Sequence, residues 1–517
     1  MTDVFPAAPW MFPLADEAAT VRFGARVADW LRPGDFVALT GDLGAGKTTF
    51  VRALLRRHAS RPELDVPSPT FSLVQLYESG PFPVVHADLY RIETPEELVE
   101  LGLDEDAEDA VVLVEWADRL GDALPADRLD VAFRLPDPDD DGQRQAEIVG
   151  HGRLAGRLRQ LWTVERCLEE AGFAGATRRH VTGDASTRAY DRLAAPDGRT
   201  AMLMLSPPRA DAVVPRYNRP YHHIARLAPD IRPFLAMDQA LVEQGLSAPG
   251  LLGFDIPAGL AVIEDLGDRS CVGPEGPVAE RYGEAVHVLA LLHGRTLPRS
   301  VPVPGEAAPY EIPPYDLDAL LVEVELLLDW FAPQVAGVTV SASTRAGFMS
   351  IFGGLLEPLL RQPLTWTLRD YHSPNLIWLP GRTGASRVGL IDFQDCVLGP
   401  PAYDLVSLLQ DARVTVPDPL EMRLLGAYAQ ARRTADSGFD MARFSVAYAI
   451  MGVQRASKIL GIFARLDKRD GKPQYLAHLP RIERYLGKGL GHPMLRDLRG
   501  WFETHLPRAL PEDGAPE

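Results

Sequence analysis

Residues 41–48, with the sequence GDLGAGKT, constrain the fold of this chain more than any other stretch. The apolar run at residues 35–40 precedes them, and apolar side chains recur at helical spacing in residues 49–55. A strand, a glycine-rich turn and a helix N-terminus in this order can bind a phosphate. The backbone N–H groups of the turn curl around the anion, and the helix dipole adds positive potential. We therefore expect an α/β domain with a P-loop nucleoside triphosphatase fold.

Each residue type in this loop has an expected role. The Lys47 ammonium is expected to reach the β- and γ-phosphates, and the Thr48 hydroxyl to hold Mg²⁺. Lys47 is also the only lysine in the first 457 residues, where every other basic side chain is arginine or histidine. A compact ammonium suits a phosphate, so the retention of one lysine here supports the prediction. The loop residues expected to bind the nucleotide are Gly41, Gly44, Ala45, Gly46, Lys47, Thr48 and Thr49.

Three further positions follow the loop. Two prolines just before Thr70 exclude a helix, so Thr70 is expected on a loop or at a strand start, where its hydroxyl could contact a γ-phosphate. Residues 84–91 are expected to form a strand with the carboxylate of Asp88 towards its end, and residues 111–116 an apolar strand that ends with the acid Glu115. In nucleoside triphosphatases an acid at such a strand end orders the water around Mg²⁺ or the attacking water. A simple turn, and a strand-end acid without a function, are the alternatives.

These segments resemble the TsaE family. The matching stretches are GDLGAGKTT at residues 41–49, SPTF at 68–71, HADLYR at 86–91 and VEW at 114–116, in the same order within about residues 10–158. The resemblance implies ATP and Mg²⁺ binding, slow ATP hydrolysis and docking on the TsaD–TsaB transferase pair. It also implies a role in the N6-threonylcarbamoyladenosine modification at position 37 of tRNA, with the tRNA contacted only indirectly.

The resemblance also implies roles for single residues. Thr70 matches a switch-like threonine, and Trp116 matches the tryptophan that follows the acid and lies in the nucleotide site. Asp88 and Glu115 match the acidic partners of the metal or water, and Glu115 is the expected catalytic residue. An alternative makes this domain chiefly an interaction module for the transferase complex, with weak turnover.

Composition narrows the classes of function. The net charge of −18 and the pI of about 5.2 make the chain a poor binder of bulk nucleic acid or of a membrane surface, which agrees with a tRNA contact supplied by partners. Cys167, Cys271 and Cys396 are far apart and offer neither a disulfide framework nor metal-ligand spacing. No apolar run approaches the length of about 20 residues that a membrane span needs. We expect a cytoplasmic protein.

The chain changes character after its first third. Residues 136–142 form an acidic loop with two prolines, and the pattern becomes helical from residue 154 to 170. We place the boundary near residue 158. The prediction is a P-loop ATPase domain at residues 1–158 and a second domain at residues 159–517.

Two segments carry the chemistry of the second domain. Asp370 is followed by Asn375, and an apolar run then ends in Asp392 and Phe393. This spacing is that of kinase-like folds. Asp370 would accept or orient the proton of an attacking hydroxyl, and Asn375 and Asp392 would hold the Mg²⁺ that bridges the ATP phosphates. Residues 375–379 and 388–391 are expected to form a β-ribbon that fixes the three side chains relative to one another.

The second domain resembles the aminoglycoside phosphotransferase-like kinases, an α+β fold with two lobes. The resemblance spans about residues 165–500 and is strongest towards the AmgK branch, anomeric kinases of N-acetylmuramate and N-acetylglucosamine in cell-wall recycling. It implies a small lobe at about residues 165–265 and a large lobe at about 266–505. It also implies a nucleotide-covering loop that includes Ser186 and a hinge at Glu264 and Leu266 that offers groups to adenine. Ordinary turns are the alternative for both segments.

Two departures from the family pattern stand out. Leu368 opens the catalytic segment where the family usually has a histidine. No lysine occurs between Lys47 and Lys458, so the usual small-lobe lysine is missing, and methionines 202 and 204 lie on the strand where it is expected. Either Arg188 or Arg192 replaces this lysine, or backbone N–H groups and Mg²⁺ bind the phosphates without a basic side chain.

The expected function is therefore bifunctional. The first domain is an ATPase of tRNA modification, and the second is a sugar kinase that transfers the γ-phosphoryl of ATP, with Asp370 as base. Another small alcohol, such as choline, homoserine or an aminoglycoside, is the alternative acceptor. A kinase fold that serves only as a scaffold is a further alternative, and Leu368 is the feature that favours it.

Overall fold

A computed structural model describes residues 10–69, 72–92, 97, 109–135, 144–181, 188–209 and 218–510. The chain forms two compact units, residues 1–166 and 167–517. Helix α4 (Arg153–Glu170) contains both the division between these units and residue 158, where the sequence placed the boundary. The two units are described separately below.

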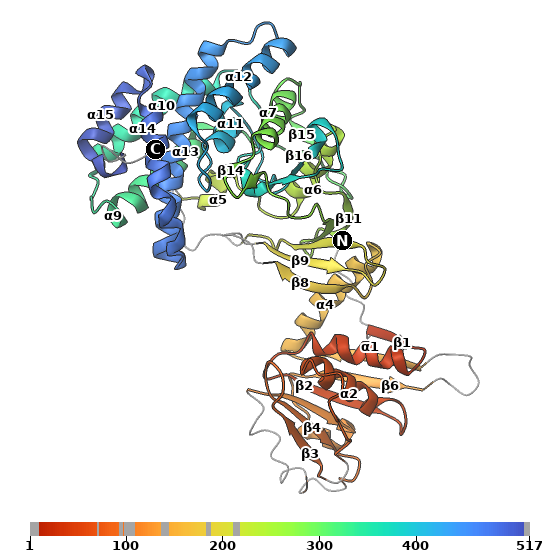
Figure 1. Ribbon diagram of the computed structural model, residues 1–517. Coiled ribbons are helices and arrows are strands. Elements are labelled where there is room, and N and C mark those ends of the chain that lie inside the picture. The colour runs from red at the N-terminus through yellow and green to blue at the C-terminus, as the bar shows by residue number, and fades with distance from the viewer. Residues whose placement is uncertain are drawn as a thin grey trace. The chain divides into compact units, whose positions relative to one another are not determined.

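Among the described residues of the first unit, seven strands form one sheet in the order β1-β7-β6-β2-β5-β4-β3 (Figure 1). Strand β2 pairs in parallel with β5 and β6, and β4 pairs in parallel with β5. The remaining neighbours are antiparallel. The strands are β1 (Trp10–Leu14), β2 (Phe36–Gly41), β3 (Val74–Tyr77), β4 (Val84–Asp88), β5 (Val111–Glu115), β6 (Leu129–Arg134) and β7 (Arg144–Gly150).

The parallel centre of this sheet is apolar on both faces. Val37 and Leu39 of β2 pack in one core together with residues of helices α1 (Glu17–Ala28) and α2 (Lys47–His58). Phe36 and Ala38 point to the opposite core. Strands that are buried on both sides need such continuous apolar runs. The carboxyl ends of β2, β4 and β5 therefore meet at one edge, where the predicted site residues follow.

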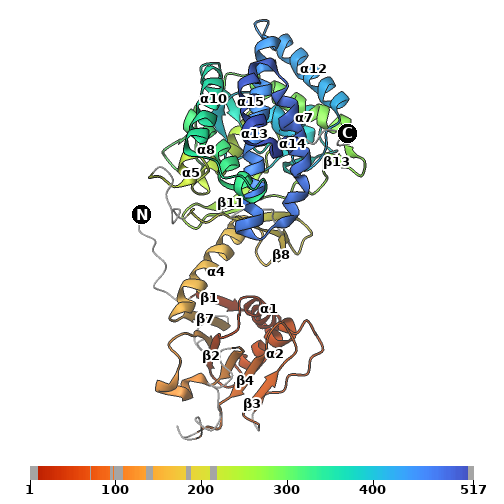
Figure 2. The same cartoon turned by 90° about the vertical axis from the view of Figure 1, so that its left-hand side faces the viewer.

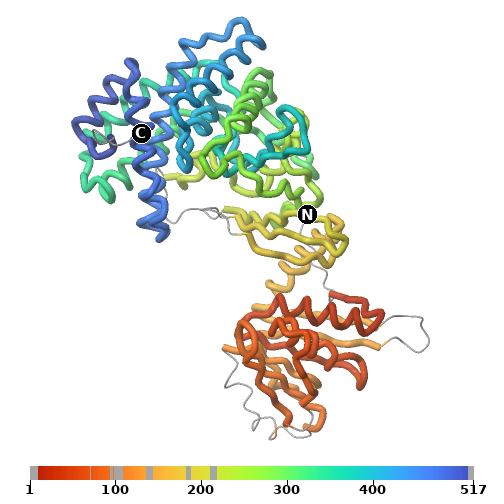
Figure 3. Tube along the Cα trace, viewed as in Figure 1, coloured from red at the N-terminus to blue at the C-terminus, as the bar shows by residue number. Residues whose placement is uncertain are grey.

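The second unit has two lobes, and its small lobe is a sheet. Among the described residues, five antiparallel strands follow the order β11-β12-β10-β9-β8 and lie side by side in Figure 3. Helix α6 (Arg232–Glu243) supplies buried residues to the core next to this sheet. The strands are β8 (Thr177–Val181), β9 (Ala189–Ala194), β10 (Thr200–Leu205), β11 (Leu251–Asp255) and β12 (Leu260–Glu264).

The large lobe is mostly helical. The 30-residue helix α13 is its central element and contacts α8, α11 and α14. Figure 2 shows α13 beside α14. The main helices are α7 (Ala279–His293), α8 (Leu317–Leu326), α10 (Ala342–Leu360), α11 (Ala402–Leu409), α12 (Asp418–Ala435), α13 (Met441–Asp470), α14 (Leu479–Leu490) and α15 (Arg496–His505). The described residues of this unit also include four two-stranded ribbons. They are β13 (Val272–Gly273) with β14 (Gly276–Pro277), β15 (Ser300–Val301) with β16 (Tyr310–Glu311), β17 (Thr365–Thr367) with β20 (Val397–Gly399) and β18 (Leu376–Trp378) with β19 (Val388–Leu390).

These architectures confirm the predicted fold class, an α/β P-loop domain followed by an α+β kinase-like domain with two lobes. The β18–β19 ribbon also confirms the predicted connection between the catalytic segments. In the part of the chain that the structure describes, no helix combines the length and the apolar character that a bilayer crossing needs.

Candidate active sites of the two units

The glycine-rich loop of the first unit wraps around the ammonium of Lys47. Its Nζ donates hydrogen bonds to the carbonyl oxygens of Gly41, at 2.6 Å, and Asp42, at 3.0 Å. Gly41 has φ of 130°, and a Cβ added there would lie 2.4 Å from the carbonyl oxygen of Phe133, so this position requires glycine. Gly46, with φ of 113°, caps helix α2. The loop thus presents the N-terminus of α2 as an anion site.

The other predicted loop residues extend the same segment. Gly44 has φ of 77°, and a Cβ added to it would meet no atom within 4 Å. Ala45 is buried, and its N–H donates to the carbonyl oxygen of Asp42 at 3.2 Å. Thr49 lies in the first turn of α2.

Glu115 connects the loop to the strand ends. Thr48 Oγ1 donates to Glu115 Oε2 at 2.9 Å, and His86 Nε2 lies 3.0 Å from Glu115 Oε1. His86 and Glu115 are almost fully buried. The sequence predicted Thr48 and Glu115 but missed His86. The period of two along β4 was the available signal, because it places His86 on the same face as Asp88.

Asp88 lies opposite Glu115 in the parallel register of β4 and β5. Its Oδ2 accepts a hydrogen bond of 2.6 Å from Ser68 Oγ, and its Oδ1 accepts one of 3.0 Å from the backbone N–H of Tyr90. The sequence did not single out Ser68. Thr70, its neighbour in the same segment, lies outside the described residues.

The aromatic ring of Trp116 packs against the ammonium group of Lys47. The Lys47 Nζ lies 3.7 Å from the centre of the Trp116 ring, within the range of a cation–π contact. Trp116 adopts φ of 61°, a left-handed conformation rare for a bulky residue, and such strain marks functional positions. Burial lowers the pKa of Lys47 against the opposing effect of Glu115 and Asp88.

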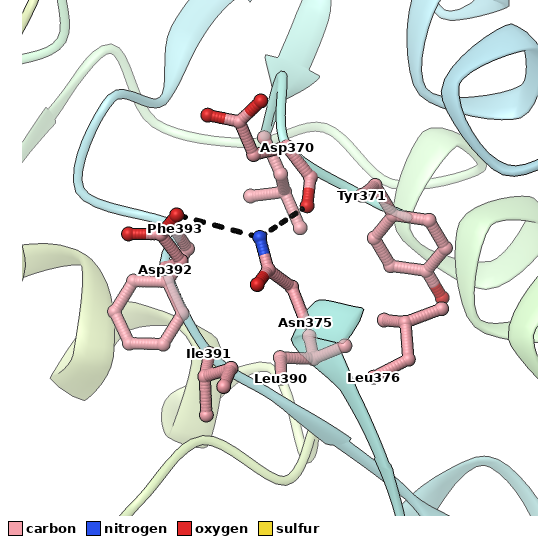
Figure 4. A pocket seen from close by; sticks show the side chains of 9 residues that line it. Asp370, Tyr371, Asn375, Leu376, Leu390, Ile391, Asp392 and Phe393 are labelled. Carbon is pink, nitrogen blue, oxygen red and sulfur yellow. Dashed lines mark hydrogen bonds between the residues drawn. The ribbon is translucent and has the colours of Figure 1, made fainter. Parts of the chain in front are cut away.

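The predicted catalytic residues of the second unit line one pocket. Figure 4 shows Asp370, Asn375 and Asp392 around it, contributed by the segments next to the β18–β19 ribbon. Asn375 Nδ2 donates to the carbonyl oxygen of Asp370, at 3.0 Å, and lies 3.4 Å from Asp392 Oδ2. Asp392 has φ of 61°, in the left-handed region that non-glycine residues adopt only uncommonly.

Basic side chains lower the pKa of the Asp370 carboxyl. Burial raises this pKa, but His372 and then Lys458 and Arg455 of α13 more than offset the effect, so the pKa lies below its ordinary value. Burial and the nearby Asp370 have the opposite net effect on the pKa of Asp392, which is raised. Two acids with pKa values pushed apart in one pocket are typical of an active site.

The backbone of the catalytic segment is held by buried acids. Asp404 of α11 accepts hydrogen bonds from the N–H groups of Leu368, at 2.6 Å, and Arg369, at 2.9 Å. Arg369 has φ of 66°, and its guanidinium forms a buried ion pair with Glu323 of α8. Leu368 itself is buried in the core. A carboxylate that receives two backbone N–H groups holds this segment, so a histidine at position 368 is not required for that purpose.

The predicted hinge residues lie at the end of β12. Glu264 accepts a hydrogen bond of 2.8 Å from Arg382 and one of 3.2 Å from the N–H of Gly250. A Cβ added to Gly389 of β19 would lie 3.0 Å from Leu266 Cδ1, so Leu266 packs against the ribbon that carries the catalytic segments. Ser186 lies outside the described residues.

Comparison with known proteins assigns both units. Residues 14–146 match the family model of the threonylcarbamoyl adenosine biosynthesis protein TsaE, and residues 177–445 match that of the phosphotransferase enzyme family. The TsaE protein of Rickettsia typhi is 38% identical over 127 residues, which cover 25% of this chain and 88% of that protein.

The second unit has relatives whose own sequences it covers almost completely. The N-acetylmuramate/N-acetylglucosamine kinase of Caulobacter vibrioides is 37% identical over 352 residues, which cover 66% of this chain and 95% of that protein. The kinase of the same name from Pseudomonas aeruginosa is 31% identical over 333 residues, 63% of this chain and 88% of that protein.

The chain belongs to both families. It is an enzyme that joins a TsaE ATPase unit to a phosphotransferase unit, and both families use ATP. The oxygen donors of both sites also fit Mg²⁺, which prefers one or two protein oxygens together with substrate phosphates. In the TsaE unit these are Thr48 and Glu115. In the phosphotransferase unit the Asn375 amide nitrogen donates to the carbonyl oxygen of Asp370, so the Asn375 amide oxygen and the Asp392 carboxylate are the oxygens that would bind the ion.

Proposed function

We propose that the phosphotransferase unit transfers the γ-phosphoryl of ATP to the anomeric hydroxyl of N-acetylmuramate and N-acetylglucosamine. The observation that carries this proposal is the convergence of Asp370, Asn375 and Asp392 on one pocket. The names of the relatives from Caulobacter vibrioides and Pseudomonas aeruginosa support the choice of acceptor.

In this proposal Asp370 orients the acceptor hydroxyl and takes its proton as the new P–O bond forms and the bond to ADP breaks. Its lowered pKa makes it a carboxylate at neutral pH, as this role requires. Asn375 and Asp392 hold Mg²⁺, which neutralises charge on the phosphates when it is bound. An anomeric hydroxyl is more acidic than an ordinary alcohol, so it suits a weak carboxylate base.

The TsaE unit is, in the same proposal, the ATPase of N6-threonylcarbamoyladenosine formation in tRNA. Lys47 and the loop N–H groups bind the triphosphate, and Thr48 with Glu115 holds Mg²⁺ and orders the attacking water. Its partner is the TsaD–TsaB transferase pair, which supplies the tRNA contact. Because ATP and tRNA are both cytoplasmic, we place the protein in the cytoplasm.

An acceptor panel tests the kinase proposal. Purified full-length protein is incubated with ATP, Mg²⁺ and each of N-acetylmuramate, N-acetylglucosamine, choline, homoserine and an aminoglycoside, and ³¹P NMR follows the product. A sugar 1-phosphate is expected with the two amino sugars and is absent with Asp370→Asn. Turnover of another alcohol without turnover of the amino sugars would refute the assignment.

Association with the transferase tests the TsaE proposal. The full chain should co-purify with a TsaD–TsaB pair, and its sugar-independent ATPase should rise when the pair is added. A matched variant, Lys47→Ala, should lose this ATPase. Full ATPase in that variant would show that the hydrolysis arises elsewhere.

A further inference from the structure

The small lobe of the phosphotransferase unit lacks the lysine that kinase-like folds place on the nucleotide phosphates. Protein kinases use a lysine on the third strand of this sheet, paired with an acid of the neighbouring helix. Here Met202 and Met204 occupy strand β10, and Met204 is fully buried in the core. On helix α6 the acid is Asp238, which is buried and whose Oδ1 has no hydrogen-bond partner among the described residues. The usual pair is therefore not formed.

Arg188 reaches the catalytic pocket from the small lobe. It immediately precedes strand β9, and its NH1 lies 2.8 Å from Asp392 Oδ1. Its side chain is only 7% exposed. The ion pair joins residues 204 positions apart and brings a guanidinium to Asp392, which lines the pocket together with Asp370 and Asn375.

Arg192, the other candidate from the sequence, points elsewhere. Its Nε lies 2.9 Å from Asp265 Oδ2, and its NH1 lies 3.9 Å from Asp268 Oδ2, so it is engaged at the hinge that follows β12. Arg188 immediately precedes β9 and Arg192 lies within this strand, four residues further along, yet the two arginines pair with different acids. Arg188 is the one that contacts a catalytic residue.

The acidic side chains around the pocket create an excess of negative charge that Arg188 can offset. Asp370, Asp392 and Asp395 bring three carboxyl groups to this region, and a triphosphate adds further negative charge. Lys458 and Arg369 on the large-lobe side are already paired with Glu323. A planar guanidinium that now binds a carboxylate can bind a phosphate oxygen with the same donor geometry.

We propose that Arg188 binds the phosphates of ATP in the phosphotransferase unit and replaces the small-lobe lysine. Without nucleotide it neutralises Asp392. With nucleotide the guanidinium exchanges the carboxylate for phosphate oxygens, and Asp392 becomes available to the metal. This inference rests on the proposed phosphotransfer site but is independent of the acceptor.

A displacement titration tests the proposal. All variants are made in the full chain with Lys47→Ala, so that the P-loop contributes little to binding. A fluorescent trinitrophenyl-ATP is displaced by ATP, ADP, AMP or adenosine in EDTA, so that no metal takes part. Arg188→Met should weaken ATP binding by about 10- to 100-fold, the loss expected for a charged hydrogen-bonded contact, and should change adenosine binding less than about 2-fold.

Two further variants sharpen the result. Arg188→Lys keeps the charge and should recover part of the preference for ATP over AMP. Arg178→Met is the matched control, because Arg178 lies on β8 of the same sheet and pairs with Asp191 at 2.7 Å, away from the pocket. It should bind every ligand as the Lys47→Ala chain does.

Four results would overturn the proposal. Unchanged ATP affinity in Arg188→Met would show that this residue does not bind phosphate. An equal loss for adenosine and ATP, or a lysine variant no better than the methionine variant, would reduce Arg188 to a structural role. A Lys47→Ala chain that binds no ATP either in EDTA or with Mg²⁺ would refute the proposed phosphotransfer site together with the inference, which distinguishes the two failures.

Discussion

The carboxylate of Asp404 accepts a hydrogen bond of 2.6 Å from the backbone N–H of Leu368. This contact fixes the start of the catalytic segment from α11, where many kinase-like folds have a histidine in the segment itself. Burial raises the pKa of Asp404 to about 7, even though the N–H groups of Leu368 and Arg369 oppose the shift. The carboxyl therefore changes its charge around neutral pH.

The first prediction concerns this contact. Asp404→Asn mimics the protonated acid, and it should lower kcat of the kinase by about 10-fold at pH 8, because a charged acceptor forms stronger hydrogen bonds with N–H groups than a neutral one. The defect should shrink as the pH falls below about 7, where the wild-type carboxyl is protonated as well. A pH profile of kcat for both proteins measures this. An equal defect at every pH would contradict the role given to ionised Asp404.

The second prediction concerns the TsaE unit. Glu115→Gln keeps the size of the side chain but removes the charge that faces Thr48 and His86. ATP hydrolysis by this unit should fall by about 100-fold or more, the usual effect of losing a group that acts on the attacking water. Nucleotide binding should remain, and a titration with a fluorescent ATP analogue measures it. Unchanged hydrolysis would exclude Glu115 as the catalytic residue.

The third prediction concerns a buried charge cluster behind the catalytic segment. Glu323 forms ion pairs with Arg369 and Lys458 and is completely buried. Glu323→Ala leaves two buried cations without a counter-charge and should lower the free energy of unfolding by about 3–5 kcal/mol.

Calorimetry of the kinase unit's melting transition measures that loss. Glu280→Ala is the matched control, because the pair of Glu280 with Arg387 is exposed and should contribute less than about 1 kcal/mol. Similar losses in both variants would argue against a special role for the buried cluster.

The fourth prediction concerns Asp238. Burial, with a smaller effect of Glu264, raises the pKa of Asp238 to about 8. The native state therefore keeps a proton that the unfolded state releases, so the stability of the wild type should fall as the pH rises towards about 8. Asp238→Asn should remove this slope.

The difference between the two proteins should reach a few kcal/mol near pH 8, because each pKa unit corresponds to about 1.4 kcal/mol. Thermal unfolding between about pH 5 and about pH 8 measures it. Parallel stability profiles would show that Asp238 ionises normally.

The side chains that the sequence analysis correctly placed near one another lie at strand ends or within one short segment. Their positions follow from the strand pattern and from their spacing along the chain. Thr48 and Glu115 meet because parallel strands β2 and β5 end at one edge. Asp370 and Asn375 meet because they share one segment, and the β18–β19 ribbon brings Asp392 to them.

Side-chain contacts between segments that are far apart in the sequence could not be predicted from spacing. Ser68 donates to Asp88, and Asp404 holds Leu368, through side chains whose direction depends on packing and not on spacing. The choice between Arg188 and Arg192 is a clear case. Both are arginines of one strand segment, and only the fold shows that one pairs with Asp392 and the other with Asp265.

The central claim is that the chain contains two ATP sites that work independently, one in each unit. A crossed assay with Lys47→Ala and Asp370→Asn in the full chain tests it most directly, with sugar-independent ATP hydrolysis and sugar 1-phosphate formation measured side by side. We predict that Lys47→Ala abolishes the first activity and retains the second, and that Asp370→Asn does the converse. Loss of both activities in either folded variant would contradict the account.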